Sequence, residues 1–123
     1  MKTLLIADDE AGVRALVRMT LEGGDYEIVE AADGEEALAL ARERHPDLTL
    51  LDVMMPGLTG VEVCRALKDD PSTRDLRIVI LTAKAQDADR EEGLTAGADD
   101  YFTKPFSPLS LIQKVDEVFE GAA

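Results

Sequence analysis

The sequence has no tryptophan and a single cysteine, Cys64, in a chain of 123 residues. One cysteine excludes an intramolecular disulfide, and its helical spacing from Val61 and Leu67 predicts a small buried residue rather than a reactive thiol. No apolar run approaches the roughly 20 residues that a membrane-spanning helix needs, and the amino-terminal apolar stretch is too short for a signal peptide. We therefore expect a cytoplasmic protein that does not enter a membrane.

Basic residues are also scarce, with 13 lysines and arginines against 26 aspartates and glutamates. The resulting net charge of −13 repels nucleic-acid phosphates, so we expect no direct nucleic-acid binding by this chain. Hydrophobic residues make up 46% of the sequence and charged residues 32%, which is typical of a folded globular chain. The length suits one hydrophobic core, and we expect residues 1–123 to form a single domain.

The apolar pattern alternates between strand-like runs and segments with helical spacing. The expected strands are residues 4–7, 26–31, 48–51, 78–81 and 101–103, and helical spacing is found around residues 13–21, 37–41, 61–67, 87–96 and 108–119. Five such β-then-α units predict an α/β fold, a five-stranded parallel doubly wound sheet with five helices on its two faces. The nearly continuous apolar runs 48–51 and 78–81 are expected to be fully buried, and the other strands to lie nearer the edges.

Residues with reactive or charged side chains stand at the carboxyl ends of four expected strands. They are Asp8, Asp9 and Glu10 after the first strand, Asp52 after the third, Thr82 after the fourth and Lys104 after the fifth. The carboxyl ends of parallel strands share one edge of a sheet, and open α/β sheets bind ligands at that edge. We therefore expect one cleft that is suited to a divalent cation and a phosphoryl group.

The acidic cluster has two explanations. Acids at the start of a helix cap free N–H groups and complement the helix dipole. Capping does not account for Asp52, however, which ends a different strand and is expected beside Asp8 and Asp9. Two carboxylates ~4 Å apart repel by about 4 kcal/mol at an effective dielectric of ~20, so such a cluster favours a bound cation, and hard oxygen ligands suit Mg²⁺.

Three further residues each have an ordinary and a functional interpretation. Asp52 is either a common strand-ending aspartate or a nucleophile for phosphoryl transfer. Lys104 is either a solvated loop lysine or a partner for Asp52 or a phosphate oxygen. Thr82 is either a strand end or helix cap, or a hydroxyl donor to a phosphoryl oxygen.

Four short motifs resemble those of response-regulator receiver domains in two-component systems. They are DDE at 8–10, LDVMMP at 51–56, LTA at 81–83 and TKPF at 103–106, with further similarity in DGEEA at 33–37 and AGADDY at 96–101. The resemblance runs from residue 2 to residue 120 with the motifs in order. It implies a flavodoxin-like sheet with strand order 2-1-3-4-5, and a signalling switch rather than a turnover enzyme.

The resemblance also implies roles for individual residues. Asp52 would accept a phosphoryl group from a histidine kinase or a histidine phosphotransfer protein, and Thr82 and Lys104 would hold the phosphoryl oxygens. The Lys104–Pro105 peptide bond would be cis. Asp9, Asp52 and the backbone carbonyl of Met54 would bind Mg²⁺ directly, and Asp8 would act mostly through water.

A conformational switch is implied as well. Tyr101 would change rotamer when Thr82 moves toward the phosphate, and this would alter the surface of the fourth helix, the last strand and the last helix. The last expected helix ends almost at the end of the sequence. The sequence therefore does not identify the downstream effector. We expect a monomer, or a dimer that forms on phosphorylation.

Two other function classes share parts of this pattern. A haloacid-dehalogenase-like phosphatase also uses an aspartate nucleophile, but it needs a second acid two residues later, where this chain has Met54. A flavodoxin-like electron carrier needs a glycine- and hydroxyl-rich phosphate loop after the first strand, where Asp8, Asp9 and Glu10 would repel the flavin phosphate. Neither the dinucleotide-binding nor the P-loop glycine pattern is present.

Overall fold

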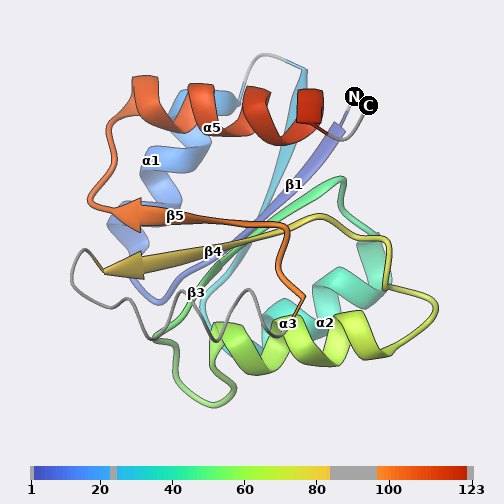
Figure 1. Cartoon of the computed structure of the whole chain (residues 1–123). Helices are drawn as coiled ribbons and strands as arrows, with labels where there is room; N and C mark the ends of the chain where they lie inside the picture. The colour runs from blue at the N-terminus through green and yellow to red at the C-terminus, as the bar shows by residue number, and fades with distance from the viewer. Residues whose placement is uncertain (1, 23–24, 84–96, 122–123) are drawn as a thin grey trace.

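The computed structural model describes residues 2–22, 25–83 and 97–121. Its strands form one five-stranded parallel sheet (Figure 1), made of β1 (Lys2–Ala7), β2 (Tyr26–Ala31), β3 (Leu48–Asp52), β4 (Ile78–Ala83) and β5 (Asp100–Lys104). The strand order is β2-β1-β3-β4-β5, which confirms the expected doubly wound topology. The helix expected at 87–96 lies outside the described residues.

Helices cover both faces of the sheet. The described helices are α1 (Ala11–Leu21), α2 (Gly34–Arg44), α3 (Gly60–Asp69) and α5 (Pro108–Gly121). Figure 1 shows α1 and α5 on one face and α2 and α3 on the other. Within the described ranges, none of these helices combines the length and the apolar character that crossing a bilayer requires.

The sheet separates two hydrophobic cores, because successive side chains of a strand point to opposite faces. Toward α2 and α3, the strands contribute Leu5, Leu51 and Ile80 among others, and Cys64 is fully buried there as predicted. Toward α1 and α5, the neighbouring strand positions Leu4, Leu50 and Leu81 pack with helix residues. Hydrophobic burial on both faces therefore fixes the register of the central strands, and with it the height at which each strand ends.

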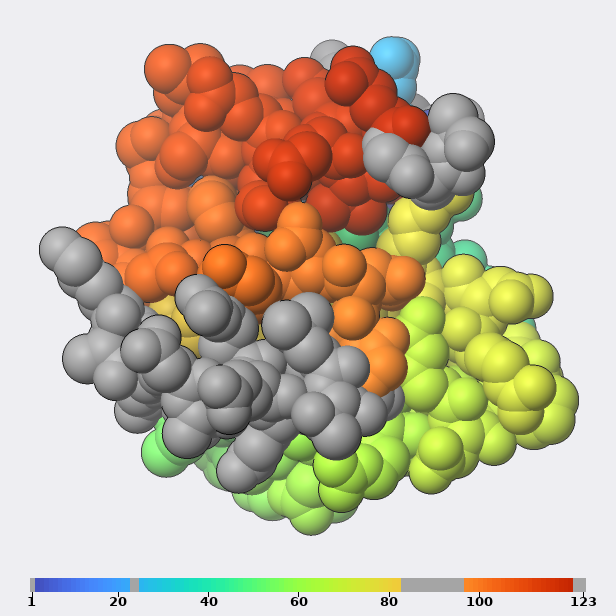
Figure 2. Space-filling view, in the orientation of Figure 1, coloured from blue at the N-terminus to red at the C-terminus, as the bar shows by residue number. Residues whose placement is uncertain are grey.

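The sheet edges agree with the strand order that the resemblance implied, but only in part with the polarity of the individual strands. β2 and β5 are the edge strands, as their polar composition predicts, and on the surface in Figure 2 the half-buried residues of β5 lie beside α5. β1 is an interior strand between β2 and β3, and its residues 4–7 are buried. Its polar character is confined to Lys2 and Thr3, at the end of the strand where the sheet meets solvent.

Side-chain caps define where two helices begin. The Asp33 side chain accepts a hydrogen bond from the backbone N–H of Glu36, 2.8 Å away, at the start of α2. α3 begins with a reciprocal capping box between Thr59 and Glu62, with donor–acceptor distances of 3.0 and 3.2 Å. These caps satisfy N–H groups that have no partner within their own helix. The loops from β2 to α2 and from β3 to α3 therefore end at fixed points.

The beginning of β1 and the end of α5 meet at Phe119. The Nζ atom of Lys2 lies 3.9 Å from the centre of the Phe119 ring, and the Arg77 guanidinium lies 5.5 Å from it. Tyr26 stacks on the same ring at a centroid distance of 6.2 Å. Cation–π and aromatic contacts thus join the first strand and the last helix at the amino edge of the sheet.

The loop after β3 is packed tightly because Gly60 has no side chain. A Cβ atom at position 60 would lie 2.2 Å from the carbonyl oxygen of Asp52, and the Gly60 N–H donates to the carbonyl oxygen of Val53, 3.1 Å away. The first residue of α3 therefore rests directly on the backbone at the end of β3. Gly12 in α1 is different, because a Cβ there would have nothing within 4 Å.

These surroundings predict opposite effects of two glycine-to-alanine changes. Gly60→Ala should lower the free energy of unfolding by about 1–3 kcal/mol, because the new methyl group overlaps backbone that cannot move without shifting Asp52. Gly12→Ala should leave stability unchanged or raise it by up to ~1 kcal/mol through helix propensity. Urea unfolding of both variants measures the difference. Equal stability of the two variants would contradict the packing described for Gly60.

Candidate functional site

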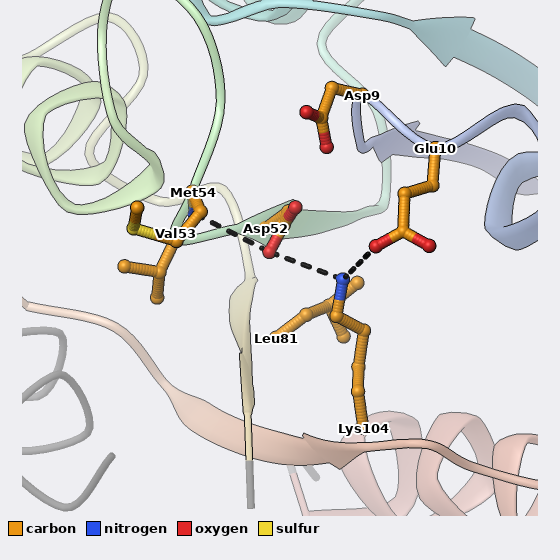
Figure 3. A pocket seen from close by; sticks show the side chains of 7 residues that line it. All are labelled: Asp9, Glu10, Asp52, Val53, Met54, Leu81 and Lys104. Carbon is orange, nitrogen blue, oxygen red and sulfur yellow. Dashed lines mark hydrogen bonds and ion pairs between the residues drawn. The ribbon is translucent and has the colours of Figure 1, made fainter.

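A cavity of about 270 Å³ opens at the carboxyl edge of the sheet. Figure 3 shows the seven residues that line it, drawn from the ends of β1, β3, β4 and β5: Asp9, Glu10, Asp52, Val53, Met54, Leu81 and Lys104. The structure thus brings together acids and a lysine that are up to 95 positions apart in the sequence, since parallel strands end at the same edge. Asp8 lies at the same place but is fully buried.

Lys104 reaches from β5 into the acidic groups. Its Nζ atom lies 3.0 Å from Oδ2 of Asp8, 3.4 Å from Oδ1 of Asp52 and 3.7 Å from Oε1 of Glu10. Burial disfavours the lysine cation, but the hydrogen bond to Asp8 and the nearby carboxylates raise the pKa of Lys104 overall. Lys104 therefore stays charged and partly neutralises the acids of β1 and β3.

Every polar atom of Asp8 has a protein partner. Its N–H donates to the Ala31 carbonyl at 3.1 Å, and its carbonyl oxygen accepts from Nη1 of Arg14 at 2.6 Å. In the side chain, Oδ1 accepts from the Glu10 N–H at 2.9 Å and Oδ2 accepts from Lys104. A fully buried carboxylate without such partners would be very costly, so these contacts explain how Asp8 is tolerated.

The buried carboxylate of Asp52 is stabilised less by hydrogen bonds and ion pairs than the carboxylate of Asp8. Burial, and after it the charge of Asp8, raises the pKa of Asp52 to about 6, although Lys104 and the Met54 N–H oppose the shift. The Met54 N–H lies 3.4 Å from Oδ1 of Asp52, a long hydrogen bond. Asp52 is thus a buried carboxylate with excess negative charge beside it, as expected for a group that acquires a cation or a new covalent bond during function.

The remaining acids extend the cluster into solvent. Carboxylate oxygens of Asp8, Asp9 and Glu10 all lie within 4.8 Å of one another, with Asp8 buried and the other two exposed. Glu10, to which the sequence motif assigned no role of its own, joins this group and also approaches Lys104. These hard oxygen donors and the excess negative charge fit Mg²⁺, which binds carboxylates while keeping several waters.

Thr82 and Tyr101 are placed near the cavity without lining it. Thr82 belongs to β4, is buried, and is paired in register with Thr103 of β5. Tyr101 is half-buried on the edge strand β5, opposite Ile80. The peptide bond between Lys104 and Pro105 is cis.

Sequence reasoning missed two residues that contact the site from behind. Arg14 of α1 holds the Asp8 carbonyl, and Glu30 of β2 in turn accepts from Nε of Arg14 at 3.1 Å. One signal was present, because Glu30 is a charged residue next to the carboxyl end of an expected strand. Arg14 gave no such signal, since an arginine in the first turns of an amphipathic helix is ordinary.

Comparison with known families gives a direct result. The model of the response regulator receiver domain matches residues 4–116. Two curated relatives are a phosphate regulon transcriptional regulatory protein, PhoB, of Pseudomonas aeruginosa, 47% identical over 95% of this chain, and the transcriptional regulatory protein ResD of Bacillus subtilis, 46% identical over 98% of it. The chain covers 51% and 49% of these two relatives, so it spans about half of their length.

Solved structures agree with this result. A putative response regulator from Chloroflexus aurantiacus is 38% identical, covers 95% of this chain and 96% of its own, and has a TM-score of 0.89. The chemotaxis response regulator CheY4 of Vibrio cholerae is 35% identical with a TM-score of 0.89, covering 96% of this chain and 98% of its own. The chain therefore belongs to the response regulator receiver domain family, whose members are phosphoacceptors of two-component signal transduction and not turnover enzymes.

Proposed function

We propose that Asp52 is the phosphoacceptor of this receiver domain. One observation carries the proposal: Nζ of Lys104 lies 3.0 Å from Asp8 and 3.4 Å from Asp52, at the edge of a cavity lined by the end of β3. Of the clustered acids, Asp52 is the one that both lines the cavity and is buried. Its carboxylate is therefore accessible from one side only, which fixes the direction of approach for a phosphoryl donor.

The partner implied by the family is a histidine kinase, and we propose that the donor is its phosphohistidine or that of a histidine phosphotransfer protein. A carboxylate oxygen of Asp52 attacks phosphorus, and the new O–P bond forms as the P–N bond breaks. The imidazole nitrogen keeps the electron pair and takes up a proton. Lys104 then holds a phosphoryl oxygen, at a distance from Asp52 that already permits an ion pair.

Receiver domains typically bind Mg²⁺ at an acidic pocket, and such a group is present here. We propose that Asp9, Asp52 and the backbone carbonyl of Met54 hold the ion directly, while Asp8 acts mostly through water. When bound, the ion neutralises negative charge that builds up on the phosphoryl oxygens. The single positive charge of Lys104 faces three carboxylates, so carboxylate oxygens remain that can bind a metal cation.

We propose further that Thr82 and Tyr101 report the phosphorylation state. Thr82 is buried one residue beyond Leu81, which lines the cavity, so a small movement brings its hydroxyl to a phosphoryl oxygen. Tyr101 lies two residues from Thr82's strand partner Thr103 and takes up the space that Thr82 leaves. The surface that changes includes β5 and α5; the helix expected at 87–96 lies outside the described residues.

The assembly around the domain is also a proposal. Residues 1–123 act as one receiver unit, as a monomer or as a dimer that forms on phosphorylation, and pass the signal to a downstream effector. The surfaces of β5 and α5 lie next to each other and are accessible (Figure 2), which supports a contact with an effector or a second copy there. The strongly negative chain does not itself bind nucleic acid.

Incubation with Mg²⁺ and a small phosphodonor should place one phosphoryl group on Asp52. Asp52→Asn should abolish the modification and keep the fold, because the two side chains have nearly the same shape. Asp75→Asn, an exposed aspartate at the opposite edge of the sheet, is the matched control and should be labelled like wild type. Peptide mass mapping is the measurement. Full labelling of Asp52→Asn, or mapping of the phosphate elsewhere in wild type, would contradict the assignment.

Mg²⁺ should raise the melting temperature of wild type, since it binds the native acidic cluster and not the unfolded chain. Asp9→Ala removes one exposed member of that cluster, so without Mg²⁺ it should be at least as stable as wild type. It should also lose most of the stabilisation by Mg²⁺, whereas Asp75→Ala should retain it. Calorimetric melting with and without Mg²⁺ tests both points. A full Mg²⁺ response in Asp9→Ala would place the ion elsewhere.

Thr82→Ala should still accept phosphate on Asp52 but should not transmit it. In wild type, a phosphoryl mimic should change amide hydrogen exchange in β5 and the start of α5. The change should be absent in Thr82→Ala and retained in Thr82→Ser, which keeps the hydroxyl. No change in wild type, or an equal change in the alanine variant, would show that Thr82 is not the link.

A further inference from the structure

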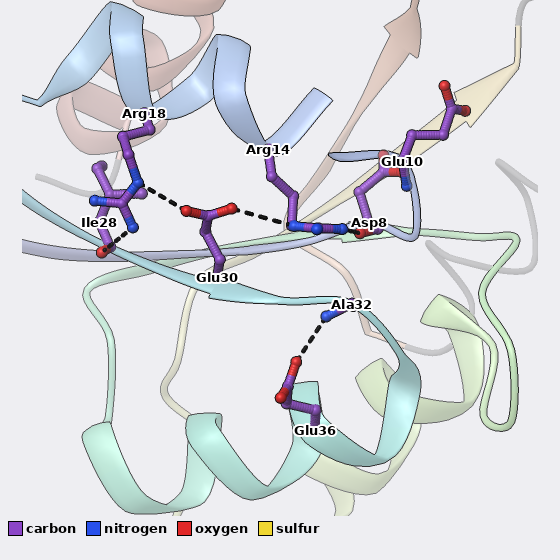
Figure 4. Close-up of polar contacts among 8 residues, drawn as sticks. All are labelled: Asp8, Glu10, Arg14, Arg18, Ile28, Glu30, Ala32 and Glu36. Carbon is purple, nitrogen blue, oxygen red and sulfur yellow. Dashed lines mark hydrogen bonds and ion pairs between the residues drawn. The ribbon is translucent and has the colours of Figure 1, made fainter. Parts of the chain in front are cut away.

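Behind the acidic residues lies an ordered array of charged side chains between α1 and β2. Figure 4 shows the Glu30 carboxylate of β2 between two arginines of α1. Oε1 of Glu30 accepts from Nε of Arg14 at 3.1 Å, and Oε2 accepts from Nε of Arg18 at 2.7 Å. Arg18 also donates to the Ile28 carbonyl at 3.2 Å and pairs with Glu22. Each arginine is therefore held by Glu30, and Arg18 is tied additionally to the strand.

This array ends at the backbone of the site. Nη1 of Arg14 donates to the carbonyl oxygen of Asp8 at 2.6 Å, while Nε of the same guanidinium is occupied by Glu30. The guanidinium is planar and rigid, so fixing Nε also fixes the direction of Nη1. Arg14 is 19% exposed and Glu30 33% exposed in their side chains, which gives these contacts more value than fully solvated ion pairs have. The hydrogen bonds from Arg18 and then Arg14 lower the pKa of Glu30, so Glu30 is charged at neutral pH.

The Asp8 carbonyl is an informative place for such a contact. It belongs to the peptide unit that joins Asp8 to Asp9, and that unit is planar. Holding its oxygen therefore sets the orientation of the backbone from which the Asp9 side chain departs. Asp9 is exposed and is a direct ligand in the proposed magnesium site, so its orientation depends on this peptide unit.

We infer that Arg14, anchored by Glu30, is a positioning residue for the magnesium and phosphoryl-transfer site. The inference rests on the proposed function and adds to it a support that comes from α1 and β2. Neither residue lines the cavity, and both act through the Asp8–Asp9 peptide unit.

The contact gains importance once a phosphoryl group is bound. Lys104 then turns from Asp8 toward a phosphoryl oxygen, and Asp8 loses the partner of its Oδ2 atom. The strand contact to Ala31, the turn contact from Glu10 and the contact from Arg14 remain. Of these, the Arg14 contact is the one made by a side chain.

Charge and positioning make opposite predictions for Arg14, which makes the inference testable. If Arg14 acts only as a nearby positive charge, removing it should tighten Mg²⁺ binding, because a cation no longer opposes another cation. If Arg14 acts by fixing the peptide unit, removing it should weaken binding. Arg14→Lys separates the two further, since it keeps the charge but cannot hold Asp8 and Glu30 with one rigid planar group.

The experiment is calorimetric titration of Mg²⁺ alone into the full chain and its variants. Outer hydrogen-bond partners of metal ligands typically contribute ~10–100-fold to affinity, and since Asp8 keeps three other partners we expect a loss of about 5- to 10-fold in Arg14→Met. Arg14→Lys should show a similar loss. Glu30→Gln should weaken binding less, and adding it to Arg14→Met should cause no further loss, since Glu30 acts through Arg14.

Glu36→Gln is the matched control for removal of one negative charge. Glu36 also lies near the end of β2, where it accepts from the Ala32 N–H at 2.8 Å, but the structure shows no contact between it and Arg14 or Asp8 among the residues of Figure 4. It should bind Mg²⁺ like wild type. A loss in Glu36→Gln equal to that in Glu30→Gln would assign the effect to charge alone and overturn the inference.

Other outcomes are equally decisive. Unchanged or tighter Mg²⁺ binding in Arg14→Met, or full rescue by Arg14→Lys, overturns the positioning role while leaving the proposed function in place. Additive losses in the Arg14→Met, Glu30→Gln double variant overturn the link between the two residues. Failure of wild type to bind Mg²⁺ overturns the magnesium proposal itself, and the inference with it. Melting temperatures measured without Mg²⁺ separate a general loss of stability from a specific loss of affinity.

Discussion

The ion pair between Lys104 and Asp8, extended to Asp52, is the interaction on which the carboxyl edge of this sheet depends. It joins β5 to β1 and β3 across the sheet and places a cation between carboxylates that would otherwise repel one another in a region with little water. Removing one member of a buried charged group is usually far more costly than the group is stabilising, because the other members stay buried without a partner. The pairing therefore constrains all three strand ends at once, and it remains incomplete, since Asp52 keeps a raised pKa.

The rest of the molecule can be understood as support for that incomplete pairing. Gly60 lets α3 begin against the Asp52 carbonyl, so the backbone at the end of β3 has little freedom to withdraw. On the other side, Arg14 and Glu30 fix the peptide unit after Asp8 from α1 and β2. The carboxylates of Asp8, Asp9 and Asp52 are thus held close together by backbone packing and by hydrogen bonds to the backbone. These contacts are not lost when a cation or a phosphoryl group binds. Such an arrangement costs no reorganisation at the moment of transfer.

Much of this could be predicted from the sequence, because it follows from rules that act along one strand at a time. Alternating β and α segments gave the parallel sheet, and the shared edge of parallel strands brought Asp52 and Lys104 together. The interior position of β1 followed from the family resemblance, which implied the strand order 2-1-3-4-5, and not from the polarity of the strand, since a strand's place in the sheet depends on how the crossovers run. The contact between Arg14 and Glu30 depends on the rotation of α1 over β2, which no local pattern encodes. The approach of Glu10 to Lys104 was not predicted either, because it depends on the side-chain geometry across the edge of the sheet.

The meeting of Lys2, Arg77 and Phe119 has a consequence for connectivity. The first strand and the last helix are held together at the amino edge, on the side of the sheet away from the acidic residues. A short peptide joining these two ends would cross no other element and would make the chain circular. New termini could then be introduced at another point of the chain. A circular permutant opened in the exposed turn around Ser72 would keep every strand pairing, because the order of elements in space does not require their order along the chain. We therefore expect the fold to tolerate a changed chain connectivity at the amino edge of the sheet, away from the acidic cavity.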